Sequence, residues 1–280
     1  MKGLERYNKI SQIQAGAYGI IYKCFDVVDK MYYAMKECDY DESCIREIKA
    51  LSVLKHPTII SLIDQFPSQF SHYIIMELGG EDLHSKIERE GPIPINSVKN
   101  IMKQILEGLC FIHENGWIHR DIKPSNILLN EDQSVRIIDF GLSRSLSGNP
   151  LSPCRFTTCY ASLDTLLGAH TYNQKVDIWG AGCTLAQMIL GKPLFTGDNQ
   201  ISVILEILKM FGSPSADEWP EMASIDYFTT FKLPSFEKTY QSVFPENTDP
   251  LAIDLIIKML NYSESKRLSA SQALEHPFFE

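Results

Sequence analysis

His119-Arg120-Asp121-Ile122-Lys123-Pro124-Ser125-Asn126 is followed by Asp139-Phe140-Gly141, eighteen positions after Asp121. A strand-loop-strand hairpin between the two stretches would bring two carboxylates and one side-chain amide together. Oxygen ligands of these kinds suit magnesium, and a positioned carboxylate can accept the proton of a hydroxyl group. An isolated Asp-Phe-Gly is equally well an ordinary turn. At this spacing from the octet, the pair of motifs indicates phosphoryl transfer from ATP.

Length and composition favour a globular protein with one large domain or two closely packed lobes. The chain has 280 residues and 44% hydrophobic content, enough to bury a sizeable core. A formal net charge of -9 opposes attraction to phosphate backbones and anionic lipid, so we expect no direct nucleic-acid partner. Residues 1–10 lack the apolar segment of a signal peptide, and no apolar run has membrane-spanning length. We therefore expect no membrane partner and a location in the nucleus or the cytoplasm.

The cysteine pattern predicts reduced thiols. The chain has seven cysteines, an odd number, and none of them forms a Cys-x-x-Cys pair. Neither a disulfide framework nor a zinc site is indicated. The cysteines are Cys24, Cys38, Cys44, Cys110, Cys154, Cys159 and Cys183.

Periodicity divides the chain into a β-rich part and a helical part. Residues 7–77 contain short runs typical of strands, interrupted by one amphipathic helix from Ser43 to Leu54 with Ser43 available as its N-cap. After Gly79-Gly80 the pattern becomes helical. We expect an α+β fold made of a small β-rich N-lobe with one helix (residues 1–78) and a larger, mainly helical C-lobe (residues 79–280).

The helical part begins with a long helix that Asn96 can cap and Asn115-Gly116 can end. Further helical patterns cover residues 176–190, 201–210, 251–260 and 270–274. Two long irregular stretches remain, residues 142–174 and 211–250. Loops of such length in compact domains are usually functional or are insertions.

Taken together, these motifs resemble those of the eukaryotic protein kinase family, from Tyr7 to Phe279. The resemblance implies a bilobal fold with ATP and Mg²⁺ between the lobes. In place of the family's phosphate-covering loop Gly-x-Gly-x-x-Gly-x-Val, the chain has Gln14-Ala15-Gly16-Ala17-Tyr18-Gly19-Ile20-Ile21, without the first glycine. Gly16 and Gly19 still permit close backbone approach to phosphates, and Ile13 and Ile21 would sandwich the adenine. Read alone, this segment is equally well a hairpin turn.

The resemblance also assigns the catalytic roles. Lys36, in Ala34-Met35-Lys36, would hold the α- and β-phosphates and pair with Glu47. Asp121 would accept the proton of the substrate hydroxyl, and Lys123 would neutralise the transferring phosphoryl group. A lone lysine on a strand is normally solvated, and a lone aspartate can be a surface-turn residue, so these roles depend on the whole set.

Three more positions complete the implied chemistry. Asn126 and Asp139 would ligate magnesium through oxygen. Thr157 would contact the base Asp121, and a lysine at position 123 together with such a hydroxyl is what kinases acting on Ser and Thr possess.

The family resemblance implies an adenine site at the hinge, residues 78–80. Met76 would be the gatekeeper, and the backbone from Glu77 to Gly79 would hydrogen-bond the base. Asp82 would lie near the ribose. Ala34 and Leu128 would lie above and below the adenine, although apolar residues would equally suit a core.

Two further positions resemble structural elements of the family. Ser162-Leu163-Asp164 stands where the family has Ala-Pro-Glu, with Arg267 as the expected ion-pair partner of Asp164. Asp177 resembles the helix aspartate that braces the catalytic loop.

Arg46, Arg120 and Arg144 resemble three arginines that converge on a phosphorylated activation-loop residue in cyclin-dependent kinases. That residue falls on Ser152 here. Any one of these arginines is more often an ordinary surface charge. Tyr18 occupies the inhibitory tyrosine position of the group, and Ala17 replaces the neighbouring threonine.

Residues 43–48 resemble the cyclin-contacting helix of the same group, which implies a cyclin partner. Residues 218–222, Asp226-Tyr227 and 230–232 look similar to the kinase subunit of general transcription factor IIH, the cyclin-dependent-kinase-activating kinase. Arg155-Phe156 and Ala161 replace residues that help these enzymes accept proline after the target, so proline direction stays open. Only eleven positions separate Lys36 from Glu47, a shorter connection than in the group, which predicts a helix that swings less.

The leading hypothesis is a Ser/Thr protein kinase that acts on proteins with a cyclin partner. A pseudokinase scaffold is the alternative from another class, favoured by the missing first glycine and by Ser162-Leu163-Asp164. A small-molecule kinase of similar fold fits residues 142–174 poorly.

Overall fold

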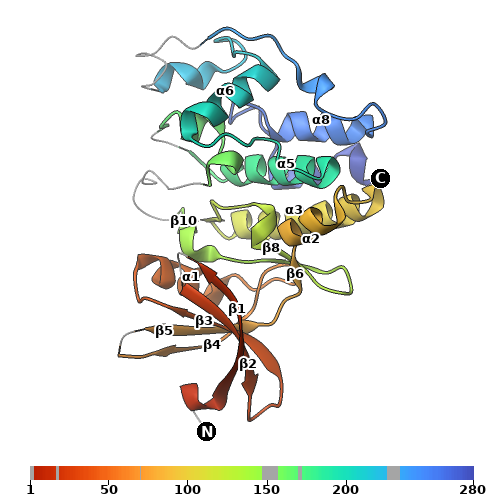
Figure 1. Ribbon diagram of the computed structural model, residues 1–280. Helices are drawn as coiled ribbons and strands as arrows, with labels where there is room; N and C mark the ends of the chain where they lie inside the picture. The colour runs from red at the N-terminus through yellow and green to blue at the C-terminus, as the bar shows by residue number, and fades with distance from the viewer. Residues whose placement is uncertain (1–2, 17–18, 70, 147–156, 170–171, 226–233) are drawn as a thin grey trace.

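The structure is a computed structural model that describes residues 3–16, 19–69, 71–146, 157–169, 172–225 and 234–280. Two lobes follow one another along the chain, a β-rich lobe that contains the N-terminus and a helical lobe that contains the C-terminus (Figure 1). The predicted α+β bilobal fold is therefore confirmed. Several sequence predictions lie outside the described residues, namely those for Ala17, Tyr18, Ser152, Arg155-Phe156, Asp226-Tyr227 and residues 230–232.

The N-lobe contains an antiparallel sheet with the strand order β1-β2-β3-β5-β4. The strands are β1 (Tyr7–Gly16), β2 (Gly19–Asp26), β3 (Tyr32–Cys38), β4 (Leu62–Pro67) and β5 (His72–Glu77). Residues paired across neighbouring strands share a face, and Ile21 pairs with Lys36 while Ala34 pairs with Met76. The register therefore gathers four predicted nucleotide-contacting residues on one face of the sheet.

The helix of the N-lobe, α1 (Glu42–Val53), begins earlier than the sequence predicts. The prediction of Ser43 as N-cap is wrong, because the carboxylate of Asp41 accepts the backbone N–H of Cys44 at 2.9 Å. Ser43 is buried instead, and it packs against Gly141, where an added Cβ would lie 2.4 Å from the Ser43 hydroxyl oxygen. The absence of a side chain at Gly141 thus allows α1 to approach the segment after Asp139.

The connection between the lobes leads into two small sheets. Residues 78–80 follow β5, and β6 (Glu81–Asp82) pairs with β8 (Ile127–Leu129), which pairs with β9 (Val135–Ile137). The hairpin of β8 and β9 joins the octet to Asp139. The second small sheet pairs β7 (Trp117–Ile118) with β10 (Arg144–Ser145).

The C-lobe is built around α5 (Lys175–Leu190), which is buried along almost its entire length. It packs between α3 (Ile95–Glu114) and α8 (Pro250–Met259) (Figure 1). The remaining α-helices of the described part are α2 (Leu83–Glu90), α4 (Leu163–Leu166), α6 (Gln200–Phe211) and α9 (Ala270–Leu274). A helix that is buried on all sides is a rigid support, and the N-terminal turn of α5 carries Asp177.

The helix α3 ends at Asn115-Gly116 as predicted, with Gly116 in the left-handed region at φ 72°. The prediction of Asn96 as its N-cap is wrong. The helix begins at Ile95, because the carbonyl of Pro94 already accepts the backbone N–H of Val98 at 3.0 Å. Asn96 lies inside the first turn.

The two stretches predicted to be irregular contain short helical turns. The first includes a 3₁₀ turn at Thr158–Tyr160 and α4, and the second includes 3₁₀ turns at Pro220–Ser224 and Tyr240–Ser242. None of the helices in the described ranges has both the length and the apolar composition needed to cross a bilayer.

Candidate active site

A cavity of about 340 Å³ lies between the lobes, within the size range of small-molecule sites. Both lobes and the connection line it. The N-lobe contributes Ile13, Gln14, Gly16, Gly19, Ile21, Ala34, Lys36, Glu47, Ile60 and Met76. The connection contributes residues 77–80, and the C-lobe contributes Lys123, Ser125, Asn126, Leu128, Ile138 and Asp139.

Sequence reasoning missed three of the lining residues. Ser125 and Ile138 each lie next to a predicted site residue in the chain, and this adjacency was the available signal. Ile60 had no such signal. An isolated bridge between Ile59 and Ile137 brings it to the cavity from a part of the chain without a motif. In the other direction, Ala15, Ile20 and Asp82 were predicted to contact nucleotide but do not line the cavity.

The side chain of Asp82 has a structural role. Its carboxylate accepts the backbone N–H of Ser85 at 2.9 Å and the Ser85 hydroxyl at 2.6 Å, so that it caps α2. The predicted contact with a ribose stays a prediction.

The end of the cavity next to residues 77–80 is apolar except for the backbone of this connection. Ile13, Ile21, Ala34, Met76 and Leu128 supply apolar walls. The N–H of Glu77 donates to the carbonyl of Ser61, and its carboxylate accepts from Arg136 Nε at 2.7 Å. This leaves the carbonyl of Glu77 and the backbone of Gly79 as the polar groups suited to a purine edge.

The two glycines of the phosphate-covering segment differ in what they require. Gly19 has φ +125°, and an added Cβ would lie 2.2 Å from the carbonyl oxygen of Glu37. A side chain at this position is excluded both by backbone strain and by collision. Gly16 has no atom within 4 Å of an added Cβ, so the space above the cavity is open there.

Lys36 Nζ lies 2.6 Å from Glu47 Oε2 and 3.7 Å from Asp139 Oδ1, and both Lys36 and Glu47 are buried. Burial disfavours the charged form of Lys36, but the carboxylates of Glu47 and Asp139 outweigh it, so the pKa of Lys36 is raised. The ammonium therefore stays charged at the point where two lobes meet. Such a fixed cation can bind the phosphates of a nucleotide.

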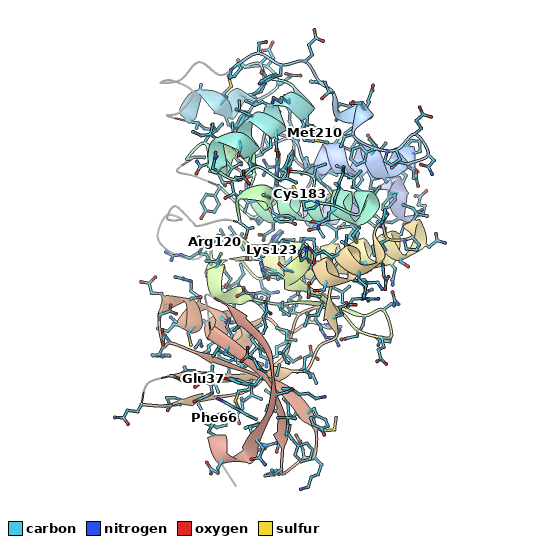
Figure 2. The ribbon with its side chains drawn as sticks, viewed as in Figure 1. Glu37, Phe66, Arg120, Lys123, Cys183 and Met210 are labelled. Carbon is cyan, nitrogen blue, oxygen red and sulfur yellow. The ribbon has the colours of Figure 1, made fainter. Side chains whose placement is uncertain are left out.

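Two side chains of the octet, Asp121 and Lys123, form a closed triangle of hydrogen bonds with Thr157. Lys123 Nζ donates to Asp121 Oδ2 at 2.7 Å and to Thr157 Oγ1 at 2.8 Å, and the Thr157 hydroxyl donates to Asp121 Oδ1 at 2.6 Å. The carboxylate of Asp121 thus already accepts one hydroxyl group, with a cation beside it. Figure 2 shows Lys123 and Arg120 at the level where the lobes meet.

The two predicted metal ligands present oxygen atoms. Asn126 Nδ2 donates to the carbonyl and to Oδ2 of Asp121, both at 2.8 Å, which turns the amide oxygen to the other side. Asp139 lies in the left-handed region at φ 63°, and its carboxylate is partly exposed to the cavity. One carboxylate and one amide oxygen form a hard donor set that suits Mg²⁺ bound together with substrate phosphates.

Asp177, on α5, fixes the backbone at the beginning of the octet. Its carboxylate accepts the backbone N–H groups of His119 at 2.9 Å and Arg120 at 2.7 Å, and His113 Nε2 lies 2.9 Å from it. Arg120 has φ 69°, a left-handed conformation that costs energy in a residue with a side chain. The paired hydrogen bonds from α5 keep the loop in this conformation.

His119 connects the octet to Asp139. Its Nε2 hydrogen-bonds the carbonyl of Ile138 at 2.9 Å, while Nδ1 accepts the N–H of Asp121 at 3.2 Å, and the ring packs edge-on against Phe140. The hydrogen-bond partners place the proton on Nε2. The octet and Asp139-Phe140-Gly141 are therefore joined through one buried side chain.

A model of the protein kinase domain matches residues 7–279 of the chain. The chain belongs to the protein kinase family. The kinase thus transfers a phosphoryl group to protein substrates, and the cavity with Lys36, Asn126 and Asp139 has the donors that the family's ATP and Mg²⁺ require.

The kinase brings two of the three predicted regulatory arginines to one segment. Arg46 Nε donates to the carbonyl of Gly141 at 2.8 Å, and Arg120 Nε donates to the carbonyl of Leu142 at 2.6 Å. Arg144 lies two residues further on, in β10. All three therefore lie at the start of the stretch that leads to Ser152, which is outside the described residues.

The kinase also contains the expected contact between Asp164 and Arg267. Arg267 Nη2 lies 3.4 Å from Asp164 Oδ2, and both side chains are buried. This distance is longer than that of a strong charge-assisted hydrogen bond. The shorter aspartate in place of glutamate explains the gap.

Proposed function

We propose that the protein is a Ser/Thr protein kinase of the cyclin-dependent group. The triangle of Asp121, Lys123 and Thr157 is the observation that carries this proposal. It combines a carboxylate that accepts a hydroxyl with a lysine that can offset negative charge beside it. The Lys36–Glu47 ion pair and the oxygen donors of Asn126 and Asp139 support transfer over a scaffold role.

The geometry supports a division of labour during transfer. Magnesium-bound ATP supplies the phosphoryl group. Lys36, held by Glu47, orients the phosphates. Asp121 accepts the proton of the Ser or Thr hydroxyl. As it does so, the hydroxyl oxygen of the substrate bonds to phosphorus and the bond from phosphorus to the ADP oxygen breaks. Lys123 offsets the negative charge on the transferring phosphoryl group.

The crowding around Asp121 supports Ser and Thr as acceptors. Thr157 lies within hydrogen-bonding distance of both Asp121 and Lys123, so its segment packs directly beside the base. A short aliphatic side chain carries its hydroxyl close to the substrate backbone. A tyrosine holds its oxygen much farther from the backbone and fits such a site poorly.

We include a cyclin as partner, because α1 carries Glu47. A cyclin bound to α1 would determine the position of this helix, and with it the ion pair between Glu47 and Lys36. The positions of Arg46 and Arg120 support activation through phosphorylation at Ser152, since a phosphate near Gly141 and Leu142 would gain charge-assisted hydrogen bonds. Within the group, residues 218–222 favour the kinase subunit of general transcription factor IIH as the nearest type. A nuclear or cytoplasmic location belongs to the same proposal.

The decisive experiment compares the wild-type chain with Asp121→Asn. With a panel of cyclins, magnesium and ATP, the wild type is expected to place phosphate on Ser or Thr of a protein substrate. Asp121→Asn is expected to lose about 10²- to 10⁴-fold in kcat, because a general base typically contributes that much, while nucleotide binding by calorimetry stays intact. Asp254→Asn, on the exposed side of α8, is the matched control.

Three outcomes would contradict parts of the proposal. Equal activity of wild type and Asp121→Asn would remove the assigned base. Nucleotide binding without any transfer would favour the scaffold. Phosphotyrosine in the product would remove the Ser/Thr assignment.

For the regulatory part, Ser152→Ala should abolish the activation that an upstream kinase confers, and the intact mass of the treated wild type should rise by one phosphate.

A further inference from the structure

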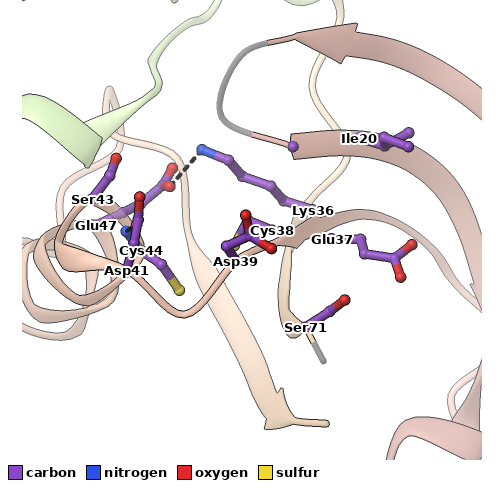
Figure 3. Close-up of a pocket in the computed structure, with 11 residues that line it drawn as sticks. Ile20, Lys36, Glu37, Cys38, Asp39, Asp41, Ser43, Cys44, Glu47 and Ser71 are labelled. Carbon is purple, nitrogen blue, oxygen red and sulfur yellow. Dashed lines mark hydrogen bonds and ion pairs between the residues drawn. The ribbon is translucent and has the colours of Figure 1, made fainter. Parts of the chain in front are cut away.

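A second cavity, of about 300 Å³, adjoins the nucleotide cavity behind the Lys36–Glu47 ion pair. The two cavities share Gly19, Lys36 and Glu47. The end of β3, the connection to α1 and the first turns of α1 form its walls (Figure 3). Two of the lining residues are cysteines, Cys38 on β3 and Cys44 on α1, and both are free.

The two thiols face the same cavity from β3 and from α1 (Figure 3). They are near enough for each to shift the pKa of the other, and Cys38 Sγ lies 3.6 Å from the carbonyl oxygen of His72. Each side chain is largely buried, with 8% of Cys38 and 3% of Cys44 exposed. The cavity that they line is a route for a small oxidant to reach them.

The two thiols lie on the same two elements, β3 and α1, that carry the Lys36–Glu47 ion pair. Cys38 lies two residues after Lys36 on β3, and Cys44 lies three residues before Glu47 on α1. A covalent bond between them would connect the two elements that carry the ion pair. It would close a small ring over the connection, which already includes the N-cap Asp41.

We propose that Cys38 and Cys44 form a reversible disulfide that fastens α1 to β3. A peroxide supplies the oxidising power. The Cys44 thiolate attacks one peroxide oxygen, which breaks the O–O bond and forms a sulfenic acid and a hydroxide. The hydroxide takes up the proton that the Cys44 thiol released on ionising and becomes one water. Cys38 then attacks the sulfenic sulfur, the S–S bond forms, and a second water leaves with the proton of Cys38. A dithiol reverses the change by thiol–disulfide exchange.

The environment determines which thiol reacts first. Burial raises the pKa of both thiols, and the charge of Lys36 opposes this rise at both. The interaction between the two thiols lowers the pKa of Cys44 and raises the pKa of Cys38. Cys44 is therefore the attacking thiol and Cys38 the resolving one, and the reaction accelerates as the pH rises because the thiolate is the nucleophile.

The test uses the full chain, hydrogen peroxide and trypsin. Cleavage after Lys36 and Arg46 releases one peptide, residues 37–46, that contains both cysteines. After oxidation and alkylation, this peptide is expected to be lighter by two hydrogens and to carry no alkyl group, and further cleavage after Glu42 should leave its halves linked. Dithiothreitol should restore two alkylation sites.

Matched variants separate the pair from other thiols. Cys110→Ser, on α3, is expected to leave the linked peptide unchanged. Cys38→Ser should leave a sulfenic acid at Cys44 that dimedone traps, and this readout does not require kinase activity. Two alkyl groups on residues 37–46, under conditions that oxidise Cys110, would overturn the proposal.

The effect of the disulfide on the mobility of α1 can be measured separately. Amide hydrogen exchange of residues 42–53 is expected to slow about tenfold in the oxidised wild type and to remain unchanged in Cys38→Ser treated in the same way. Unchanged exchange in a fully linked chain would overturn the claim that the bond holds α1.

Discussion

In the C-lobe, the carboxylate of Asp177 accepts two backbone N–H groups of the catalytic loop, whereas in the N-lobe Glu47 holds Lys36 through one side-chain ion pair. The first arrangement fixes the backbone itself. The second fixes only the ends of two long side chains, and it depends on where α1 lies. The C-lobe half of the active site is therefore fixed more rigidly than the N-lobe half.

The backbone conformations show the same contrast. Arg120 and Asp139, both in the C-lobe half, have left-handed φ values of 69° and 63°. Such strain costs about 1 to 3 kcal/mol per residue and persists only where the surroundings determine it fully. The C-lobe half is therefore built in advance, and control of activity is easier to exert on the N-lobe half, where α1 and β3 meet.

Asp177→Ala should have the largest effect, because it leaves the buried N–H groups of His119 and Arg120 without an acceptor. Each unsatisfied group costs about 1 to 3 kcal/mol, so the unfolding free energy should fall by about 2 to 6 kcal/mol. Urea unfolding measures this loss. Asp254→Ala is the control, since Asp254 also accepts from a histidine, His276, but has a half-exposed carboxylate. Equal losses in both variants would show that the catalytic loop is held elsewhere.

Glu47→Gln should have a smaller effect on stability, because Lys36 keeps Asp139 at 3.7 Å. A hydrogen bond to a neutral amide replaces one to a carboxylate, which predicts a loss of about 1 to 2 kcal/mol and a decrease of about tenfold in kcat/KM. Steady-state kinetics and urea unfolding check the two values. Glu42→Gln, also on α1 but exposed, should change neither. A loss larger than that of Asp177→Ala would reverse the comparison between the halves.

The pH dependence of stability should carry the signature of Asp177. Burial opposes its ionisation, but hydrogen bonds from His113 and the His119 N–H outweigh burial, so the pKa of Asp177 is lowered. A carboxylate with a lowered pKa stabilises the fold above its ordinary pKa of about 4, and this contribution is lost as the pH falls through the folded value. The difference in unfolding free energy between wild type and Asp177→Asn should therefore shrink below about pH 4. A constant difference from neutral to acidic pH would contradict this.

The chemistry-bearing residues could be predicted from the sequence because short local structures position them. The hairpin of β8 and β9 brings Asn126 and Asp139 together, and the octet itself places Lys123 beside Asp121. Helix periodicity and the short connection after β3 explain why Glu47 reaches Lys36. In each case a few residues of regular geometry determine the contact.

The errors arose where two local solutions compete or where the contact is long-range. Asp41 and Ser43 are both good N-cap residue types, and in the fold the carboxylate of Asp41 takes this role. Ile60 reaches the cavity through pairing with residues far along the chain, which no local pattern reports.

The smallest predicted effect concerns Asp164, where the kinase has the shorter acid. Arg267 already donates to the carbonyls of Asn261 and Lys175, so the carboxylate at 3.4 Å adds little. Asp164→Glu should bring the carboxylate into a normal hydrogen-bond distance and raise the unfolding free energy by less than about 1 kcal/mol. Asp164→Asn, which removes the charge without adding length, should lower it slightly, and thermal unfolding can compare the two. If the glutamate destabilised the kinase more than the asparagine, the site would have no room for the longer side chain, and the 3.4 Å distance would reflect tight packing and not a side chain that is too short.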